Sequence, residues 1–234
     1  MKKMILPQLF IYDLDGTLID SVPNISKAIN LALQEVFSVE ASIDEVRTWV
    51  GNGSLKLAAR ALNYAQEPSN KSLVNEKALA NLHQRFLHYY GRDIHRPNPV
   101  FEGVHELLRL VHKTGTPQAV ATNKPQQFVP SLLKNEGLTP YISAIVGGNS
   151  LPERKPHPLP LEYLCRRFHC QPDKAIMIGD SESDAISAKK AGIPCWLVEQ
   201  GYAQGIDLQQ LGALEVFKDM QKLLGYTQTL IHKP

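Results

Sequence analysis

The sequence has few cysteines, no long apolar run and little net charge, and each absence excludes a class of protein. Three of its 234 residues are cysteines (Cys165, Cys170 and Cys195), and none forms a CxxC pair. A disulfide scaffold is therefore excluded, and we expect reduced, partly buried thiols in a cytoplasmic protein. No stretch approaches the roughly 20 apolar residues of a membrane helix. Pro7 and Asp13 interrupt the apolar start, so we expect no secretory signal peptide.

The charge balance gives no support for nucleic-acid binding. The 25 Lys and Arg residues and 23 Asp and Glu residues leave a formal net charge of +2, which is too small for a strongly basic surface. Hydrophobic residues make up 43% of the chain and charged residues 21%, as in an average globular protein. The length suits one domain with an insertion, or two small domains.

Strands and helices are predicted to alternate along most of the chain. Short apolar runs rich in β-branched residues, each followed by polar residues or glycine, predict strands at residues 9–12, 118–121, 144–146, 175–178 and 195–198. One helix is predicted before each of the last four strands, at residues 104–112, 125–135, 158–168 and 182–191. This alternation predicts a parallel sheet that helices cover on both faces.

The segment between about residues 20 and 97 differs because it contains no convincing strand. Amphipathic patterns predict helices there, over residues 25–36, 55–62 and 73–90. A capping box formed by Ser42 and Glu45 predicts the start of one more helix. We therefore expect two domains, a core of residues 1–18 and 97–234 and a helical insertion of residues 19–96.

Charged and polar residues follow the predicted strands directly, where ligands bind in an open α/β sheet. In chain order they are Asp13 and Asp15, Thr122 and Asn123, Lys155, Asp180 and Asp184. Two carboxylates about 4 Å apart repel by roughly 4 kcal/mol at an effective dielectric near 20, so converging acids need a cation. Oxygen ligands without a Cys or His pair favour Mg²⁺ over Zn²⁺, and Mg²⁺ usually binds phosphate as well.

Four motifs, taken together, resemble the haloacid dehalogenase-like superfamily in its phosphatase branch. They are DxDGT at residues 13–17, TN at 122–123, KP at 155–156 and GDSxxD at 179–184. Each is weak evidence alone, but all four in this order after predicted strands are specific. The resemblance spans essentially the whole chain and implies a Rossmann-like parallel-sheet core with an inserted α-helical cap.

Closer features resemble the bacterial phosphoglycolate phosphatase family. They are the cap loop at residues 50–53, the glycine pair at 147–148, and the segments at 155–158 and 199–202. The sequence departs from that family at Asn149, where many relatives have an acidic residue. It also departs at Glu182 and Ser183, which replace the usual Arg-Asn. Both departures leave the preference among substrates open.

The resemblance implies a Mg²⁺-dependent phosphomonoester hydrolase that converts 2-phosphoglycolate into glycolate and phosphate. Asp13 is the implied nucleophile, which forms an aspartyl-phosphate, and Asp15 is the implied general acid and base. The implied Mg²⁺ ligands are the Asp13 side chain, the Asp15 carbonyl and Asp180. Lys155 is the implied catalytic lysine, and the implied substrate-binding residues are Thr122, Asn123, Gly51 and Asn52. Asp184 is left either as an outer metal ligand or as a helix cap.

Other functions stay open at this stage. A pyrophosphatase or a broad sugar-phosphate phosphatase would use the same residues, as would a phosphomutase that passes the phosphoryl group to a second hydroxyl. A non-catalytic binding module is a further alternative. Asp15 argues against a dehalogenase or a phosphonate-cleaving enzyme, because the resemblance implies that those relatives usually have no acidic residue at this position. The expected partner is a small phosphate ester, and the expected assembly is a monomer or homodimer. Lys56 and Arg60, four residues apart, suit a solvated helix face better than a contact with a substrate carboxylate.

Overall fold

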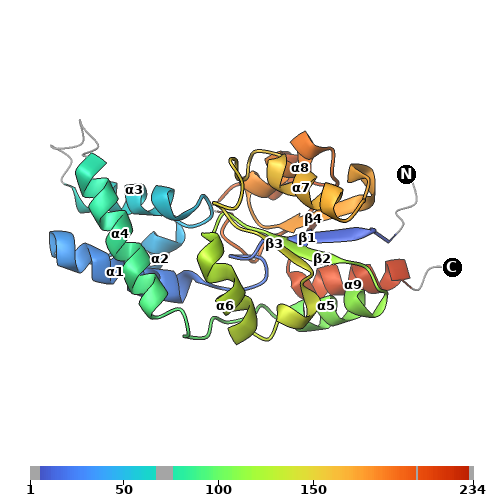
Figure 1. Ribbon diagram of the computed structural model, residues 1–234, viewed down its shortest axis with the longest axis horizontal. Helices are drawn as coiled ribbons and strands as arrows, with labels where there is room; N and C mark the ends of the chain where they lie inside the picture. The colour runs from blue at the N-terminus through green and yellow to red at the C-terminus, as the bar shows by residue number, and fades with distance from the viewer. Residues whose placement is uncertain (1–5, 67–75, 204, 232–234) are drawn as a thin grey trace.

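The computed structural model describes residues 6–66, 76–203 and 205–231, and its central element is a parallel sheet (Figure 1). The strands are β1 (Leu9–Tyr12), β2 (Gln118–Ala121), β3 (Ala144–Val146), β4 (Ala175–Gly179), β5 (Cys195–Val198) and β6 (Glu215–Phe217). Their order is β3-β2-β1-β4-β5-β6, and every neighbouring pair is parallel. This is the Rossmann-like order, so the predicted fold class is confirmed. The order reverses between β1 and β4, and the crevice at their carboxyl ends is where such folds bind ligands.

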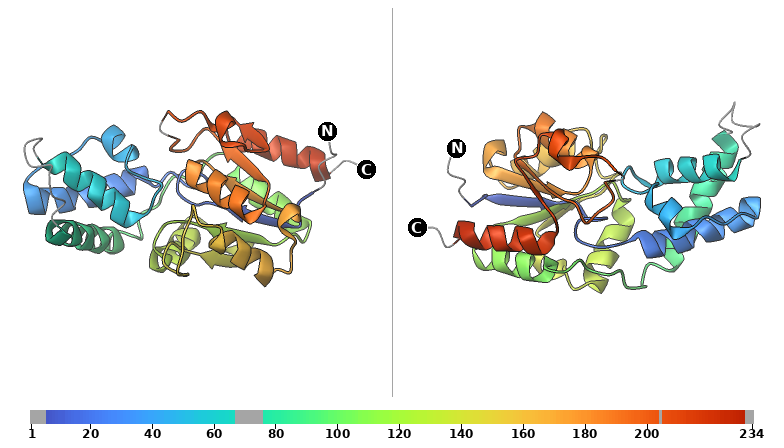
Figure 2. Two further views of the ribbon diagram at one scale, coloured as in Figure 1. Left: turned by 90° about the horizontal axis from the view of Figure 1, so that it is seen from above. Right: turned by 180° about the vertical axis from the view of Figure 1, so that it is seen from behind.

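Helices cover both faces of the sheet, and β1 contributes side chains to both. The α-helices of the core are α5 (Val104–Lys113), α6 (Val129–Asn135), α7 (Leu159–Arg167), α8 (Glu182–Ala191) and α9 (Met220–Ile231). Short 3₁₀ turns complete it: η2 (Gln126–Phe128), η3 (Thr139–Tyr141), η4 (Pro172–Lys174) and η5 (Leu208–Leu211). Leu9 and Ile11 pack under α7 and α8, whereas Phe10 and Tyr12 pack in the layer of α5, α6 and α9 (Figures 1 and 2). Burial on both faces explains why this strand is a continuous apolar run.

Among the described residues, four helices lie between β1 and α5, as predicted. They are α1 (Val22–Phe37), α2 (Ile43–Arg47), α3 (Ser54–Ala65) and α4 (Glu76–Arg92), which we call the helical unit. The unit lies beyond one end of the sheet, and its helices α1 and α4 pack against each other (Figures 1 and 2). At the start of α2 the Glu45 N–H donates to Ser42 Oγ at 3.1 Å, as the capping signal predicted. The first three residues of the helix predicted at 73–90 lie outside the described residues.

Two neighbouring segments connect the helical unit to the sheet, and they are hydrogen bonded to each other. Ile19 and Val100 form an antiparallel bridge. The Asp20 N–H donates to the Pro99 carbonyl at 2.8 Å. We call residues 19–20 and 99–100 the paired connection. The chain therefore leaves the core and returns to it at almost the same point.

Among the described strands and α-helices of the core, the edge strand β6 and the last helix α9 were not predicted. The three residues of β6 are each half-buried, so they form no continuous apolar run. Cys165, Cys170 and Cys195 are buried free thiols. Over residues 6–66, 76–203 and 205–231, no helix has both the length and the apolar character needed to cross a bilayer.

Candidate active site

Three buried carboxylates meet at the carboxyl ends of β1 and β4. Asp13 follows β1, Asp180 follows β4, and Asp184 lies in the first turn of α8. One carboxylate oxygen of each lies within 4.8 Å of the others, and the residues are 6%, 1% and 0% exposed. Burial raises the pKa of Asp13 to about 7, Lys155 opposes this rise, and the neighbouring carboxylates add to it. Burial likewise raises the pKa of Asp180. We call these three residues the acid cluster.

Lys155 is the cation that contacts the acid cluster. Its Nζ lies 2.9 Å from Asp13 Oδ1 and 2.6 Å from Asp184 Oδ1. Burial alone would lower the pKa of Lys155, but the two carboxylates outweigh burial and raise it above the usual range. The ammonium is therefore charged and offsets part of the negative charge of the acid cluster.

Asp184 caps helix α8, one of the two roles that the sequence left open, and it also contacts Lys155. Its Oδ2 accepts hydrogen bonds from the Ser181 N–H at 3.1 Å and from Ser181 Oγ at 2.6 Å, which caps the start of α8. Its Oδ1 accepts from Lys155, so both oxygens have partners. Of the two residues that depart from the family pattern here, Glu182 is exposed, and Ser183 is buried with its Oγ 3.0 Å from Ser181 Oγ.

Asp180 is held in place through both of its oxygens. Thr17 Oγ1 donates to Oδ1 at 2.9 Å, and the Tyr202 backbone N–H donates to Oδ2 at 2.7 Å. The hydroxyl of Tyr202 donates to Asp20 Oδ1 at 2.7 Å and accepts from the Ser21 N–H at 3.0 Å. Tyr202 therefore joins the acid cluster to the paired connection.

Asp15 lies outside the acid cluster and contacts a second buried lysine. Gly16, with φ of +87°, turns the chain after it, a conformation that favours glycine. Lys124 Nζ lies 2.8 Å from Asp15 Oδ1 and 4.8 Å from the centre of the Tyr90 ring. Lys124 is buried, and its carboxylate partner raises its pKa although burial acts in the opposite direction. The two acidic residues of the DxD motif are therefore each paired with a different lysine.

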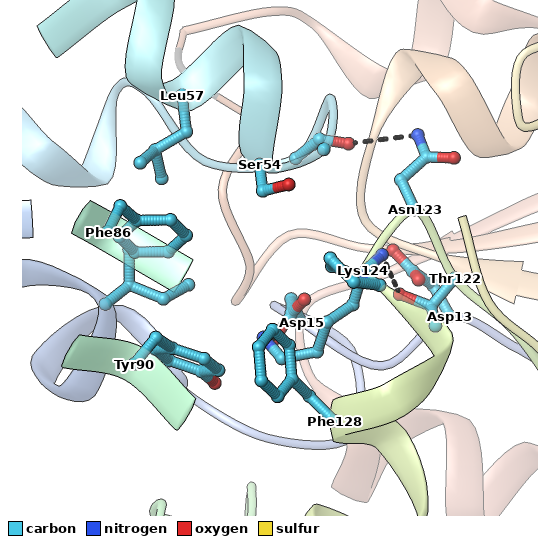
Figure 3. A pocket seen from close by; sticks show the side chains of 14 residues that line it. Asp13, Asp15, Ser54, Leu57, Phe86, Tyr90, Thr122, Asn123, Lys124 and Phe128 are labelled. Atoms are coloured by element: carbon cyan, nitrogen blue, oxygen red, sulfur yellow. Dashed lines mark hydrogen bonds and ion pairs between the residues drawn. The ribbon is translucent and has the colours of Figure 1, made fainter. Parts of the chain in front are cut away.

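A cavity of about 40 Å³ separates the ends of the strands from the helical unit (Figure 3). The core contributes polar and charged groups, among them Asp13, Asp15, Thr122, Asn123 and Lys124. The helical unit contributes mainly apolar and aromatic groups, among them Ile25, Leu57, Phe86 and Tyr90, together with Gly51, Gly53 and Ser54. A space of this size holds only a few water-sized groups. The cavity therefore suits a small ligand whose polar end faces the core.

The loop at residues 50–53, between α2 and α3, reaches the core through Asn123. Its Nδ2 donates to the Lys155 carbonyl at 3.0 Å and to the Gly51 carbonyl at 3.4 Å. Asn52, in contrast, lies outside the cavity, and its Oδ1 accepts a hydrogen bond from Arg60 at 2.6 Å. Arg60 also donates to the Trp49 carbonyl at 2.7 Å, so its guanidinium holds the loop and does not point at a ligand.

Residues 10–198 match the family of haloacid dehalogenase-like hydrolases. The chain belongs to this family. A phosphoglycolate phosphatase of Haemophilus influenzae is 37% identical over 213 residues, which is 91% of this chain and 95% of that protein. One of Psychrobacter arcticus is 37% identical over 219 residues, 94% of this chain and 95% of that protein. A crystal structure of a predicted phosphoglycolate phosphatase from Haemophilus somnus has a TM-score of 0.88 at 35% identity, covering 96% of this chain and 100% of that one. The family and the enzyme class predicted from the sequence, a phosphoric monoester hydrolase, are confirmed.

Most residues predicted for the site of this hydrolase lie around one point. Those that line the cavity are Asp13, Asp15, Thr122, Asn123 and Gly51, and Lys155 and Asp180 adjoin Asp13. Asn149 lies away from the cavity, and its Oδ1 accepts from the Gln126 N–H at 2.8 Å, which fixes the loop after β3. The sequence interpretation missed Lys124 and Tyr90. Lys124 directly follows the TN motif, so a signal was present, but Tyr90 comes from α4 without any local pattern.

Proposed function

We propose that this hydrolase is a Mg²⁺-dependent phosphatase that converts 2-phosphoglycolate into glycolate and inorganic phosphate through an aspartyl-phosphate on Asp13. One observation carries the proposal. Asp13 lies beside Lys155 and within the acid cluster, while Asp15, two residues later, faces a small cavity. The relatives that are named phosphoglycolate phosphatases support the choice of substrate.

The proposed reaction has two displacements at phosphorus. A carboxylate oxygen of Asp13 attacks the phosphorus while the bond to the glycolate oxygen breaks, and Asp15 gives that oxygen a proton. Asp15 then removes a proton from the water that attacks the aspartyl-phosphate, which releases phosphate and restores Asp13. Lys155, 2.9 Å from Asp13, offsets charge on the phosphoryl oxygens. Thr122 Oγ1 accepts from the Lys124 N–H at 3.2 Å, so its own O–H is left to donate to the phosphoryl group.

The donor set at the acid cluster fits Mg²⁺. Within the described acid cluster, three carboxylate groups face the single ammonium of Lys155, so a bound cation would favour their ionised forms, and all the donors are oxygens. Asp13 and Asp180 would hold the ion together with the Asp15 carbonyl. Asp184, which caps α8 and contacts Lys155, would act through water. When bound, the ion would offset charge that develops on the phosphoryl group.

The same proposal extends to the organisation of the chain. We assign residues 19–96 as a cap domain and residues 1–18 and 97–234 as the catalytic core, because the paired connection lies where these segments meet. The cap would exclude water from the cavity during the first displacement. The partner would be a small phosphate ester, in a cytoplasmic monomer or homodimer.

The test is phosphate release from 2-phosphoglycolate compared with pyrophosphate, glucose 1-phosphate and an aryl phosphate. We expect kcat/KM for 2-phosphoglycolate to exceed the others at least about tenfold, which is about 1.4 kcal/mol in transition-state binding. EDTA should abolish turnover, and added Mg²⁺ should restore it. Asp13→Asn should be inactive and should incorporate no radiolabelled phosphate into acid-quenched protein.

Three results would contradict parts of the proposal. Turnover by Asp13→Asn would exclude the aspartyl-phosphate, and a flat substrate profile would point to a broad phosphatase. A bisphosphate intermediate without net phosphate release would indicate a phosphomutase.

A further inference from the structure

The cavity contains a buried hydroxyl that has no hydrogen-bond partner. Tyr90 is 4% exposed, and its hydroxyl is unpaired within the described part of the chain. Burial raises the pKa of Tyr90, although Lys124 opposes this, so the hydroxyl is protonated and can donate. A buried hydroxyl without a partner destabilises the protein. A ligand that accepts a hydrogen bond at this position would offset that destabilisation.

Lys124 supplies a positive charge at the same place. Among the described residues that line the cavity, it is the only one with a cationic side chain. An ammonium has three N–H donors. Lys124 donates one to Asp15 at 2.8 Å and also interacts with the nearby Tyr90 hydroxyl, so at least one donor is left for a ligand. Because its Nζ lies over the Tyr90 ring, the two donors are neighbours across the boundary between core and helical unit (Figure 3). A carboxylate can accept from both, one bond to each oxygen.

The contact with Asp15 relates this pair to the reacting bond. In the proposed function, on which this inference rests, Asp15 protonates the ester oxygen of the leaving group. In 2-phosphoglycolate a single methylene separates that oxygen from the carboxylate. Lys124 Nζ, 2.8 Å from Asp15 Oδ1, is therefore within reach of the carboxylate when the ester oxygen is at Asp15. Phe86 and Phe128 line the same cavity and offer apolar contacts to that methylene.

We propose that Lys124 and Tyr90 together bind the carboxylate of the leaving group and so select phosphate esters of small α-hydroxy acids. The two residues come from different parts of the chain, the loop after β2 and helix α4. A bound carboxylate would therefore hold the helical unit against the core while the ester is cleaved. A substrate without a carboxylate would leave the Tyr90 hydroxyl unpaired.

The test compares 2-phosphoglycolate with ethyl phosphate, which keeps the ester carbon but has no carboxylate. We expect Tyr90→Phe to lower kcat/KM for 2-phosphoglycolate about tenfold and to change that for ethyl phosphate less than about twofold. Lys124→Met should slow both substrates, because it also removes the partner of Asp15, so the ratio of the two kcat/KM values is its readout. We expect that ratio to fall at least about a hundredfold. Inhibition by glycolate provides a readout without turnover, and its inhibition constant should rise about tenfold in Tyr90→Phe.

Matched controls lie close to both residues. The Tyr89 hydroxyl, one residue earlier on α4, donates to Glu35 at 2.8 Å at an exposed site, so Tyr89→Phe should leave the substrate ratio unchanged. Exposed Lys134 on α6 serves in the same way for Lys124.

Equal losses on both substrates in Tyr90→Phe, or an unchanged glycolate inhibition constant, would overturn the proposed binding of the carboxylate by Lys124 and Tyr90. If the wild type itself fails to prefer 2-phosphoglycolate over ethyl phosphate, both the proposed substrate and the proposed carboxylate-binding pair are wrong. If the wild type prefers 2-phosphoglycolate and both variants keep that preference, the proposed substrate stands and only the role of Lys124 and Tyr90 is wrong.

Discussion

Replacing Tyr202 with phenylalanine should reduce stability much more than activity. The hydroxyl donates to Asp20 at 2.7 Å and accepts from the Ser21 N–H at 3.0 Å, so the variant loses both hydrogen bonds. Ser21 is completely buried, which prevents its N–H from turning to bulk water. The backbone N–H of Tyr202, which donates to Asp180, is unchanged. We therefore expect kcat to stay within about threefold of wild type.

The size of the stability loss follows from these contacts. A hydrogen bond to a charged group contributes about 1.5–3 kcal/mol, and an unpaired buried N–H costs about 1–3 kcal/mol. The ring remains and keeps its contact with Arg47, whose guanidinium lies 5.7 Å from the ring centre. Local relaxation recovers part of the loss, so we expect the free energy of unfolding to fall by about 3 kcal/mol. For a chain of this length that corresponds to a decrease in Tm of about 6–12 °C.

Urea unfolding followed by tryptophan fluorescence measures this difference, because Trp49 lies in the helical unit and Trp196 in β5. Tyr64→Phe is the matched control, since its exposed hydroxyl donates to the Glu40 carbonyl at 3.2 Å. The control should lose less than about 0.5 kcal/mol. A loss as small as this in Tyr202→Phe would refute the reasoning, as would normal stability with a kcat lowered more than about tenfold.

Three further predictions concern the acid cluster and the thiols. Thr17→Val removes the hydroxyl that donates to Asp180 at 2.9 Å, so half-maximal activity should need about ten- to a hundredfold more Mg²⁺ in a metal titration; an unchanged requirement would contradict this. Lys155→Met removes the ammonium from the acid cluster, so kcat/KM should fall at least about a hundredfold and the rise in Tm on adding Mg²⁺ should exceed that of wild type. An equal rise would mean that Lys155 does not offset that charge. Burial raises the pKa of Cys165 to about 11, so the thiolate is scarce at pH 8 and becomes abundant only as the pH rises toward that value. Alkylation of Cys165 at pH 8, followed by mass spectrometry, should be at least about a hundredfold slower in the folded protein than in urea, and equal rates would contradict the packing.

The strands that could be predicted from the sequence are those marked by a short run of mainly apolar residues, and they include β3, which lies half-buried at the edge of the sheet. Strands β1 and β5 are fully buried and form continuous apolar runs, whereas β2 is fully buried but begins with the polar Gln118. Strand β6 lies at the edge of the sheet, and its half-buried Glu215 interrupts any such run. Helix α9 could have been recognised, because its buried Met220, Leu223 and Leu230 follow a helical spacing.

The site residues divide in a similar way. Asp13, Asp180 and Lys155 belong to local motifs that follow strands, and the parallel sheet brings strand ends together at one edge. Lys124 and Asp15 are 109 positions apart, so only the folded chain shows that they form a pair. The same holds for Tyr90, whose position in the cavity depends on how α4 packs over the core. A local sequence pattern shows which element a residue follows along the chain. A binding site also depends on residues from distant parts of the chain, which only the folded structure brings together.

The paired connection has a consequence for how enzymes of this kind diversify. Ile19 and Val100 are neighbours, so the two ends of the helical unit join the core at adjacent positions. With respect to the sheet, the whole unit is one long loop. The entropy cost of closing such a loop grows only slowly with its length. Helical units of other sizes can therefore be exchanged at this junction while the strands and the acid cluster keep their geometry. Because the unit supplies the apolar wall of the cavity, such an exchange would change the substrate specificity and leave the residues that carry out the reaction unchanged.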